Sequence, residues 1–219
     1  ETWPFQHATT TMHLGNAYAA LAQHDWWGTT NLDKARAAFE TALSLLDRDR
    51  TPIDWAAAQN NYAIALQTLG QKTGDAAMLH ASAQAFLDAA SAYPRDKLPL
   101  DWAMTQFNRG NTLKLLGAMG DAEAYSQAAQ AYRAALEEFT RERAPLQWAT
   151  ATASLGDTLQ SIANTETGTD NLREAVALRR AALEVLSADI APLEWANANN
   201  GLGTSLLNLS NREQNAGDL

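Results

Sequence analysis

The chain has 219 residues, and its hydrophobic content of 46% is typical of a folded protein rather than a disordered one. Its formal net charge of −9 argues against nonspecific binding to nucleic acid or to an anionic membrane, and it favours a neutral or basic partner. The lack of cysteine excludes disulfides and thiolate metal sites, and no apolar run is long enough to cross a bilayer.

A short motif, Trp-Ala, returns along the chain at a nearly constant interval. Its copies begin at Trp55, Trp102, Trp148 and Trp195, which are 47, 46 and 47 residues apart, and His7-Ala8 stands 48 residues before the first. Self-similarity at such a period is typical of repeat proteins, in which each unit buries its apolar face against its neighbours. We therefore expect one elongated domain, 1–219, of stacked units.

The first repeat, 4–50, predicts a pair of helices. Pro4 opens the first helix, because proline is tolerated in a first turn where its missing N–H has no partner. The residues that follow at helical spacing are Leu14, Gly15, Tyr18 and Leu21. After a turn that contains Gly28, the second helix carries an aromatic residue between two small ones, at Ala35, Phe39 and Ala42. This face predicts close packing on the first helix.

The next three repeats, 51–97, 98–143 and 144–190, follow the same plan. Their first helices open at Pro52, Pro99 and Pro145, and Thr51 supplies a hydroxyl suited to capping a helix. Turns at Gly74, Gly120 and Gly168 separate the paired helices. The face of each second helix consists of Ser82, Phe86 and Ala89, then Ala128, Tyr132 and Ala135, then Ala175, Arg179 and Ala182.

A partial repeat, 191–219, closes the sequence. Pro192 opens a helix whose apolar stripe holds Leu202, Leu206 and Leu209, with Gly203 beside it, and a polar stretch follows at 211–219. No second helix is predicted to cover this stripe. We expect another copy of the chain, or further sequence, to meet it.

Leu-Gly on each first helix, followed by Ala, an aromatic residue and Ala on the second, resembles the tetratricopeptide repeat. The resemblance covers the whole chain, although units of about 46–47 residues exceed the usual 34 and look like those of bacterial multi-repeat proteins. It implies a right-handed α–α superhelix of four helix-turn-helix repeats plus one extra helix. It also implies a concave face, lined by the first helices, that binds peptides or proteins.

Charge is distributed unevenly along the repeats. The five first-helix segments, 7–22, 55–70, 102–117, 148–163 and 195–210, contain three charged residues, Arg109, Lys114 and Asp157, among 80 positions. The face of these segments that lies opposite their packing stripe is rich in amides instead. An Asn side chain can both donate to and accept from a peptide backbone. Crowding in an inner helix layer explains part of this depletion, but it does not predict so many asparagines, which are poor helix formers.

The candidate peptide-binding groove follows from this face. Its residues are Met12, His13, Asn16, Asn60, Asn61, Ile64, Met104, Phe107, Asn108, Asn111, Lys114, Ser154, Asp157, Asn197 and Asn200. Met104, Phe107 and Ile64 are expected to form side-chain pockets. Lys114 is the one cation suitably placed for a terminal carboxylate, so recognition of a free C-terminus is not expected.

Other features favour structure over chemistry. The recurring tryptophans indicate anchors between consecutive units, and connections such as Arg48-Asp49-Arg50 indicate solvated surface. The turn His24-Asp25-Trp26-Trp27-Gly28 is either an exposed aromatic contact site or, as we favour, cover for the open end of a core. Asp157 and Lys114 are expected to pair across the groove. Scattered histidines and the lack of a phosphate-binding loop predict no enzyme, no metal and no cofactor.

These patterns predict a cytoplasmic scaffold, because the sequence shows no signal-peptide pattern. The sequence starts at Glu1 without Met, which indicates a trimmed N-terminus. The scaffold would hold a peptide or protein segment in its groove. An alternative hypothesis is a structural, self-associating or regulatory module of a larger signalling protein. Neither hypothesis involves nucleic acid or a membrane.

Overall fold

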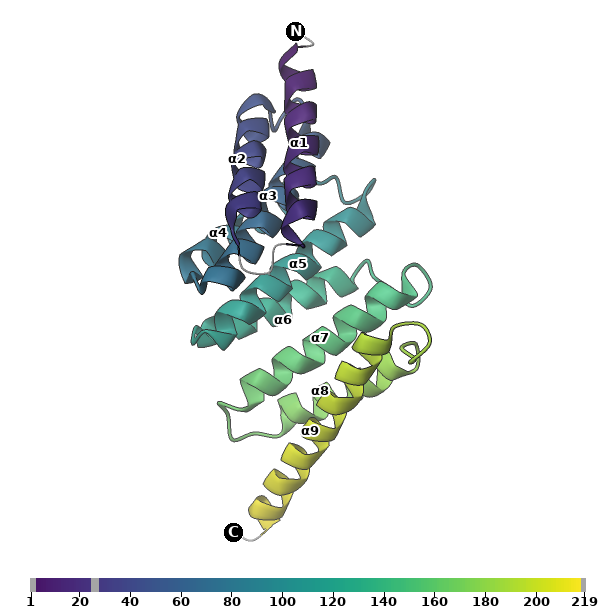
Figure 1. Cartoon of the computed structure of the whole chain (residues 1–219). Helices are drawn as coiled ribbons and strands as arrows, with labels where there is room; N and C mark the ends of the chain where they lie inside the picture. The colour runs from purple at the N-terminus through teal and green to yellow at the C-terminus, as the bar shows by residue number, and fades with distance from the viewer. Residues whose placement is uncertain (1–2, 25–27, 218–219) are drawn as a thin grey trace. The chain divides into compact units, whose positions relative to one another are not determined.

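The computed structural model describes residues 3–24 and 28–217, and in these ranges the chain is all α-helical (Figure 1). The helices are α1 (Trp3–Ala22), α2 (Thr30–Leu45), α3 (Pro52–Thr73), α4 (Ala76–Ala92), α5 (Pro99–Ala118), α6 (Ala122–Leu136), α7 (Pro145–Ala163), α8 (Asp170–Leu183) and α9 (Pro192–Gly217). Each predicted first and second helix is confirmed. The turn residues Asp25, Trp26 and Trp27 lie outside the described residues.

Local sequence sets the helix starts. Proline stands in the first turn of α3, α5 and α7, as predicted. The prediction that Thr51 caps α3 is wrong. The Thr51 hydroxyl donates to the carbonyl of Asp47 at 2.8 Å and makes no capping bond. Side-chain caps occur instead on the second helices, where Asp75 accepts from two backbone N–H groups and Asp121 accepts from one.

Glycine stands at the ends of α3 and α5, and α9 extends into the polar stretch at 211–219. Gly74 and Gly120 adopt φ values of 69° and 108°, which favour glycine because it has no Cβ. At the end of the chain, α9 continues to Gly217, so the polar stretch is largely helical rather than a tail. Arg212 explains part of this extension, since its guanidinium donates to the carbonyls of Ala163 and Gly168.

Paired helices pack through the predicted small and aromatic residues. Phe39 of α2 is 1% exposed, and a Cβ built on Gly15 of α1 would lie 2.6 Å from its ring. In the second pair, Phe86 of α4 packs with Ala63 of α3 in a buried cluster. The glycine or alanine on the first helix therefore allows an aromatic side chain to approach its backbone.

The tryptophans are confirmed as anchors at two positions. Trp55 packs on a cluster of Ala8, Leu46 and Ala58, which come from α1, the turn after α2, and α3. Trp148 packs on a cluster that includes Ala182 of α8 and Ala198 of α9. Each of these rings thus joins one helix pair to the next.

Two leucines of the first predicted stripe do not belong to the core. Leu14 is 47% exposed and Leu21 is 55% exposed. Leu69 of α3 corresponds to Leu21, and it is buried because it packs on Ala22 and Leu32 of the preceding pair. Within the described residues α1 contacts α2 and α3, so no preceding pair covers its leucines.

The chain divides into two compact units, 1–119 and 120–219. The boundary falls inside the third predicted repeat, between α5 and α6. In the first unit, α3 lies between α1 and α5 and contacts both; in the second, α7, α8 and α9 contact one another. The single domain expected from the sequence stays a prediction.

Candidate functional site

An amide ladder crosses the candidate groove of the first unit. Asn61 of α3 donates from Nδ2 to Oδ1 of Asn16 on α1 at 3.1 Å. On the other side, Oδ1 of Asn60 lies 3.3 Å from the hydroxyl of Thr105 on α5, which shares its proton with the carbonyl of Asp101 at 2.9 Å. Nδ2 of Asn60 lies 3.5 Å from Oδ1 of Asn61. Three helices distant in sequence are therefore linked by side-chain polar groups.

These amides remain accessible. Asn16 is exposed, and Asn60 and Asn61 are half-buried, whereas Thr105 is 1% exposed. The bond to Asn61 uses the oxygen of Asn16 and leaves its NH2 donors for another partner. The sequence predicted amides facing a ligand, but it did not predict that these amides bond to one another.

Apolar side chains accompany the ladder. Ile64 is 37% exposed and Met104 is 39% exposed, both more than expected for large apolar residues of an inner helix layer. Phe107 is half-buried. Met12 is also half-buried, and it packs on the Ala8, Leu46 and Ala58 cluster, so part of its side chain serves the core.

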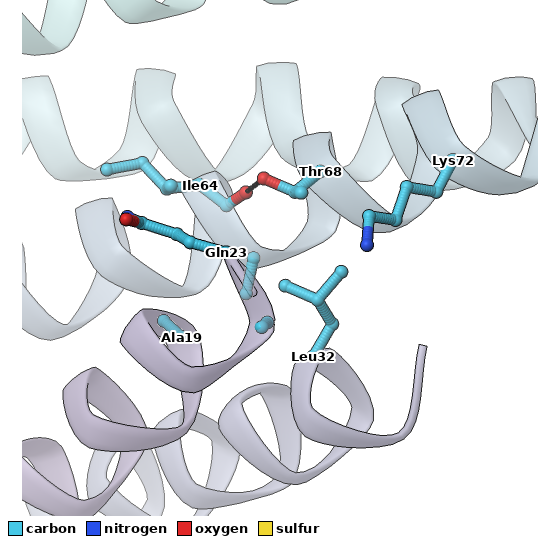
Figure 2. A pocket seen from close by; sticks show the side chains of 8 residues that line it. Ala19, Gln23, Leu32, Ile64, Thr68 and Lys72 are labelled. Carbon is cyan, nitrogen blue, oxygen red and sulfur yellow. Dashed lines mark hydrogen bonds between the residues drawn. The ribbon is translucent and has the colours of Figure 1, made fainter. Parts of the chain in front are cut away.

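Ile64 also lines a hollow between the first two helix pairs (Figure 2). The volume of this hollow is about 310 Å³, and the hollow lies between the end of α1, the start of α2 and α3. Most of the residues that line it are apolar, and Gln23, Thr68 and Lys72 add polar side chains (Figure 2). Lys72 donates from Nζ to the carbonyl of Gly28 at 3.2 Å and closes one side.

The other candidate residues of the first unit lie at different depths. His13 is exposed, while Asn108, Asn111 and Lys114 are half-buried. Neighbouring Arg109 is also half-buried, and desolvation by burial lowers the pKa of its guanidinium.

In the second unit, a buried arginine that the sequence analysis did not single out as functional contacts the candidate face. Arg179 of α8 is 2% exposed and donates to Oδ1 of Asp157 at 2.8 Å and to Oε1 of Gln160 at 2.9 Å. Its guanidinium also donates to the hydroxyl of Ser205 on α9. Asp157 thus has a partner in its own unit. The predicted pair of Asp157 with Lys114, which belongs to the first unit, stays a prediction. The remaining candidates, Ser154, Asn197 and Asn200, are half-buried or exposed.

Glycines give this arginine its room. A Cβ built on Gly201 would lie 2.5 Å from Nε of Arg179, and one on Gly156 would lie 3.2 Å from its Cγ. The sequence offered a signal, because an arginine stands where the other second helices carry Phe or Tyr. Its side chain is long enough to reach from α8 to both α7 and α9.

Contacts between arginines of the connections and the recurring tryptophans were also not predicted from the sequence. Arg48, Arg95 and Arg141 lie over the rings of Trp55, Trp102 and Trp148, at 5.2, 4.2 and 4.2 Å from the ring centroids. Each arginine precedes its tryptophan by seven residues, so the repeat period itself carried the signal. These arginines are exposed, as predicted, but they also hold their tryptophans through cation–π contacts.

The described residues show no cluster of three or more His, Asp or Glu side chains suited to a metal ion. Of the helices in 3–24 and 28–217, none combines the length and the apolar character needed to span a membrane.

No protein-family model matches the chain, and no curated protein matches its sequence. Among solved structures, a de novo designed helical repeat protein is similar over 96% of each chain, with 14% sequence identity and a TM-score of 0.35. A similarity of this degree carries no argument about ancestry or function. The chain's own packing defines it as an all-α protein of consecutively paired helices, as in an α–α solenoid. The narrower tetratricopeptide assignment stays a prediction.

Proposed function

We propose that this protein is a non-enzymatic scaffold of the tetratricopeptide type that binds a peptide or protein segment. The segment lies on the face of α1, α3 and α5 in the first unit. One observation carries the proposal: exposed Ile64 and Met104 stand beside an amide ladder that spans all three helices. The partner is neutral or basic, because the chain carries a net charge of −9.

The ladder supports peptide binding through preorganisation. Bonds between Asn16, Asn61, Asn60 and Thr105 fix the orientation of the amides before a ligand arrives. Binding then costs less side-chain entropy than it would with freely rotating amides. Apolar side chains of the peptide would contact Ile64 and Met104, where burial of apolar surface provides most of the affinity.

The test uses peptides selected from a random library against the wild-type protein. Replacing Ile64 and Met104 together by Glu is expected to weaken the selected peptides by roughly 100-fold, because two apolar contacts are lost and two charges are buried. Fluorescence anisotropy with each labelled peptide measures the loss.

Leu87→Glu is the matched control, because Leu87 of α4 is also 40% exposed but lies on a second helix. Peptides that bind the double variant as tightly as they bind Leu87→Glu would show that this face is not the binding site.

A further inference from the structure

The apolar side of α9 differs from the equivalent side of the other first helices. Leu206 stands eleven residues after Trp195 and is 39% exposed. The residues at the same position, Leu66, Leu113 and Leu159, are 4%, 3% and 2% exposed. Trp195 is itself 39% exposed, and the place of its stacking arginine is taken by Ala188.

A notch on the same helix is open. Gly203 stands eight residues after Trp195, as Gly15 stands after His7 and Gly156 after Trp148. A Cβ on Gly15 would meet the ring of Phe39, and a Cβ on Gly156 would meet the side chain of Arg179. A Cβ on Gly203 would meet nothing within 4 Å. The backbone at Gly203 can therefore receive a large side chain from a packed helix.

An exposed cation stands on α8, the helix that packs against α9. In the preceding step of the second unit, Arg133 of α6 pairs with Glu174 of α8 at 2.9 Å. Arg180 of α8 is the repeat equivalent of Arg133, 47 residues later, and it is exposed and makes no ion pair within the described part of the chain. Because Glu174 lies five residues before Arg179, an acid at the same place on a further helix would meet Arg180.

We propose that α9 binds an amphipathic helix of a partner protein, which covers its exposed apolar face. The partner helix inserts an aromatic side chain at Gly203 and covers Leu206 and Trp195. Its sequence carries small residues four before and three after the aromatic, and an acid five before it. The aromatic residue and the two small residues follow the pattern of the internal helix pairs. The acid is inferred from the position of Arg180. This site is independent of the proposed peptide groove.

The probe is a labelled peptide with the sequence of α4 and its caps, 75–93, which holds Ser82, Phe86 and Ala89 in the required spacing. Because an isolated helix of this length is marginal in water, a lactam bridge joins Glu and Lys placed at 80 and 84, both exposed positions of α4. Fluorescence anisotropy measures its binding to the full chain. We expect the Phe86→Ala peptide to bind roughly tenfold more weakly, and an Ala81→Glu peptide to bind about threefold more tightly through Arg180.

Two protein variants locate the contact. Gly203→Leu fills the notch and is expected to reduce peptide binding by roughly tenfold. Gly168→Leu is the matched control, because a Cβ there also meets nothing within 4 Å and the residue lies in the turn after α7. Arg180→Gln should abolish the advantage of the Ala81→Glu peptide and leave the parent peptide unchanged. Circular dichroism verifies that all variants fold.

Equal binding of the parent and Phe86→Ala peptides, or equal binding to Gly203→Leu and Gly168→Leu, would overturn the proposal. Sedimentation of the full chain alone provides a separate test. A concentration-dependent dimer that Gly203→Leu abolishes would show that a second copy covers α9. This result would also overturn the proposal that a partner protein supplies the helix.

Discussion

Arg179 shows how one residue can change the chemistry of a repeat. The corresponding residues Phe39, Phe86 and Tyr132 fill the same place with rings that are at most 1% exposed. An arginine there must satisfy its donors, because an unpaired buried charge is costly. Asp157 and Gln160 of α7 and Ser205 of α9 accept from its two terminal nitrogens, whereas the buried Nε has no hydrogen-bond partner among the described residues.

Replacing Arg179 by Ala is expected to reduce the free energy of unfolding by about 3 kcal/mol, because the change removes a buried, packed side chain and breaks its ion pair with Asp157. Asp157→Asn should cost less, about 1 kcal/mol, since the Asp157 side chain is 41% exposed and screened by water. Urea unfolding followed by circular dichroism measures both changes.

The adjacent Arg180→Ala provides the control, because Arg180 is exposed and its loss should change stability by less than about 0.5 kcal/mol. Equal stabilities of the Arg179→Ala and Arg180→Ala proteins would contradict a structural role for the buried ion pair.

At the scale of the helix, the same glycine position has opposite requirements in α1 and α9. Gly15→Ala places a Cβ 2.6 to 2.9 Å from three ring carbons of Phe39, and such overpacking should destabilise the protein by about 2 kcal/mol. Gly203→Ala meets open space, so the better helix propensity of alanine should stabilise α9 by about 0.5 to 1 kcal/mol. Thermal unfolding of the two variants measures the difference. A shift of the same sign in both would contradict the packing described for Gly15.

Much of the helix arrangement was predictable because it depends on local signals. Proline marked the starts of α3, α5 and α7, and glycine marked the turns after α3 and α5. The predicted cap at Thr51 is wrong: its hydroxyl donates to the carbonyl of Asp47 in the preceding turn and accepts no capping bond.

The candidate site was less predictable, because its polar bonds join residues about 45 positions apart. The bond between Asn16 and Asn61 depends on how α1 and α3 are placed relative to one another, and a pattern within one helix does not determine that placement. The exposure of Asn16 and Ile64 follows from the helical period, whereas the reach of Arg179 to Ser205 depends on the space left by Gly201.

At the scale of the whole molecule, polar links between neighbouring repeats recur at about one repeat length. Arg48 donates to Ser91 at 2.7 Å, and Arg141 pairs with Glu184 at 2.7 Å, 43 residues away in both cases. Arg173 of α8 pairs with Glu213 of α9 at 2.9 Å, 40 residues away. Since such links join neighbouring repeats within each unit, stability depends on neighbour interfaces in both units.

Tyr93 of the first unit is half-buried and Tyr132 of the second is buried, so both units should lose stability in alkaline solution. Burial raises the pKa of Tyr93 to about 12, with a further contribution from Asp101. Burial also raises the pKa of Tyr132 in the second unit, with a smaller contribution from Asp157. In the unfolded chain both phenols ionise near pH 10, so between pH 10 and 12 the unfolded state binds fewer protons than the folded one.

The stability linked to these phenols is therefore fully present below pH 10 and is lost as the pH rises toward 12. For Tyr93 the loss should reach about 2 kcal/mol. Urea unfolding at pH 9, 10 and 11 should show a smaller decline in Tyr93→Phe and in Tyr132→Phe than in the wild type, because phenylalanine has no proton to lose. If the three proteins declined in parallel, ionisation of these phenols would not be the cause of the alkaline instability.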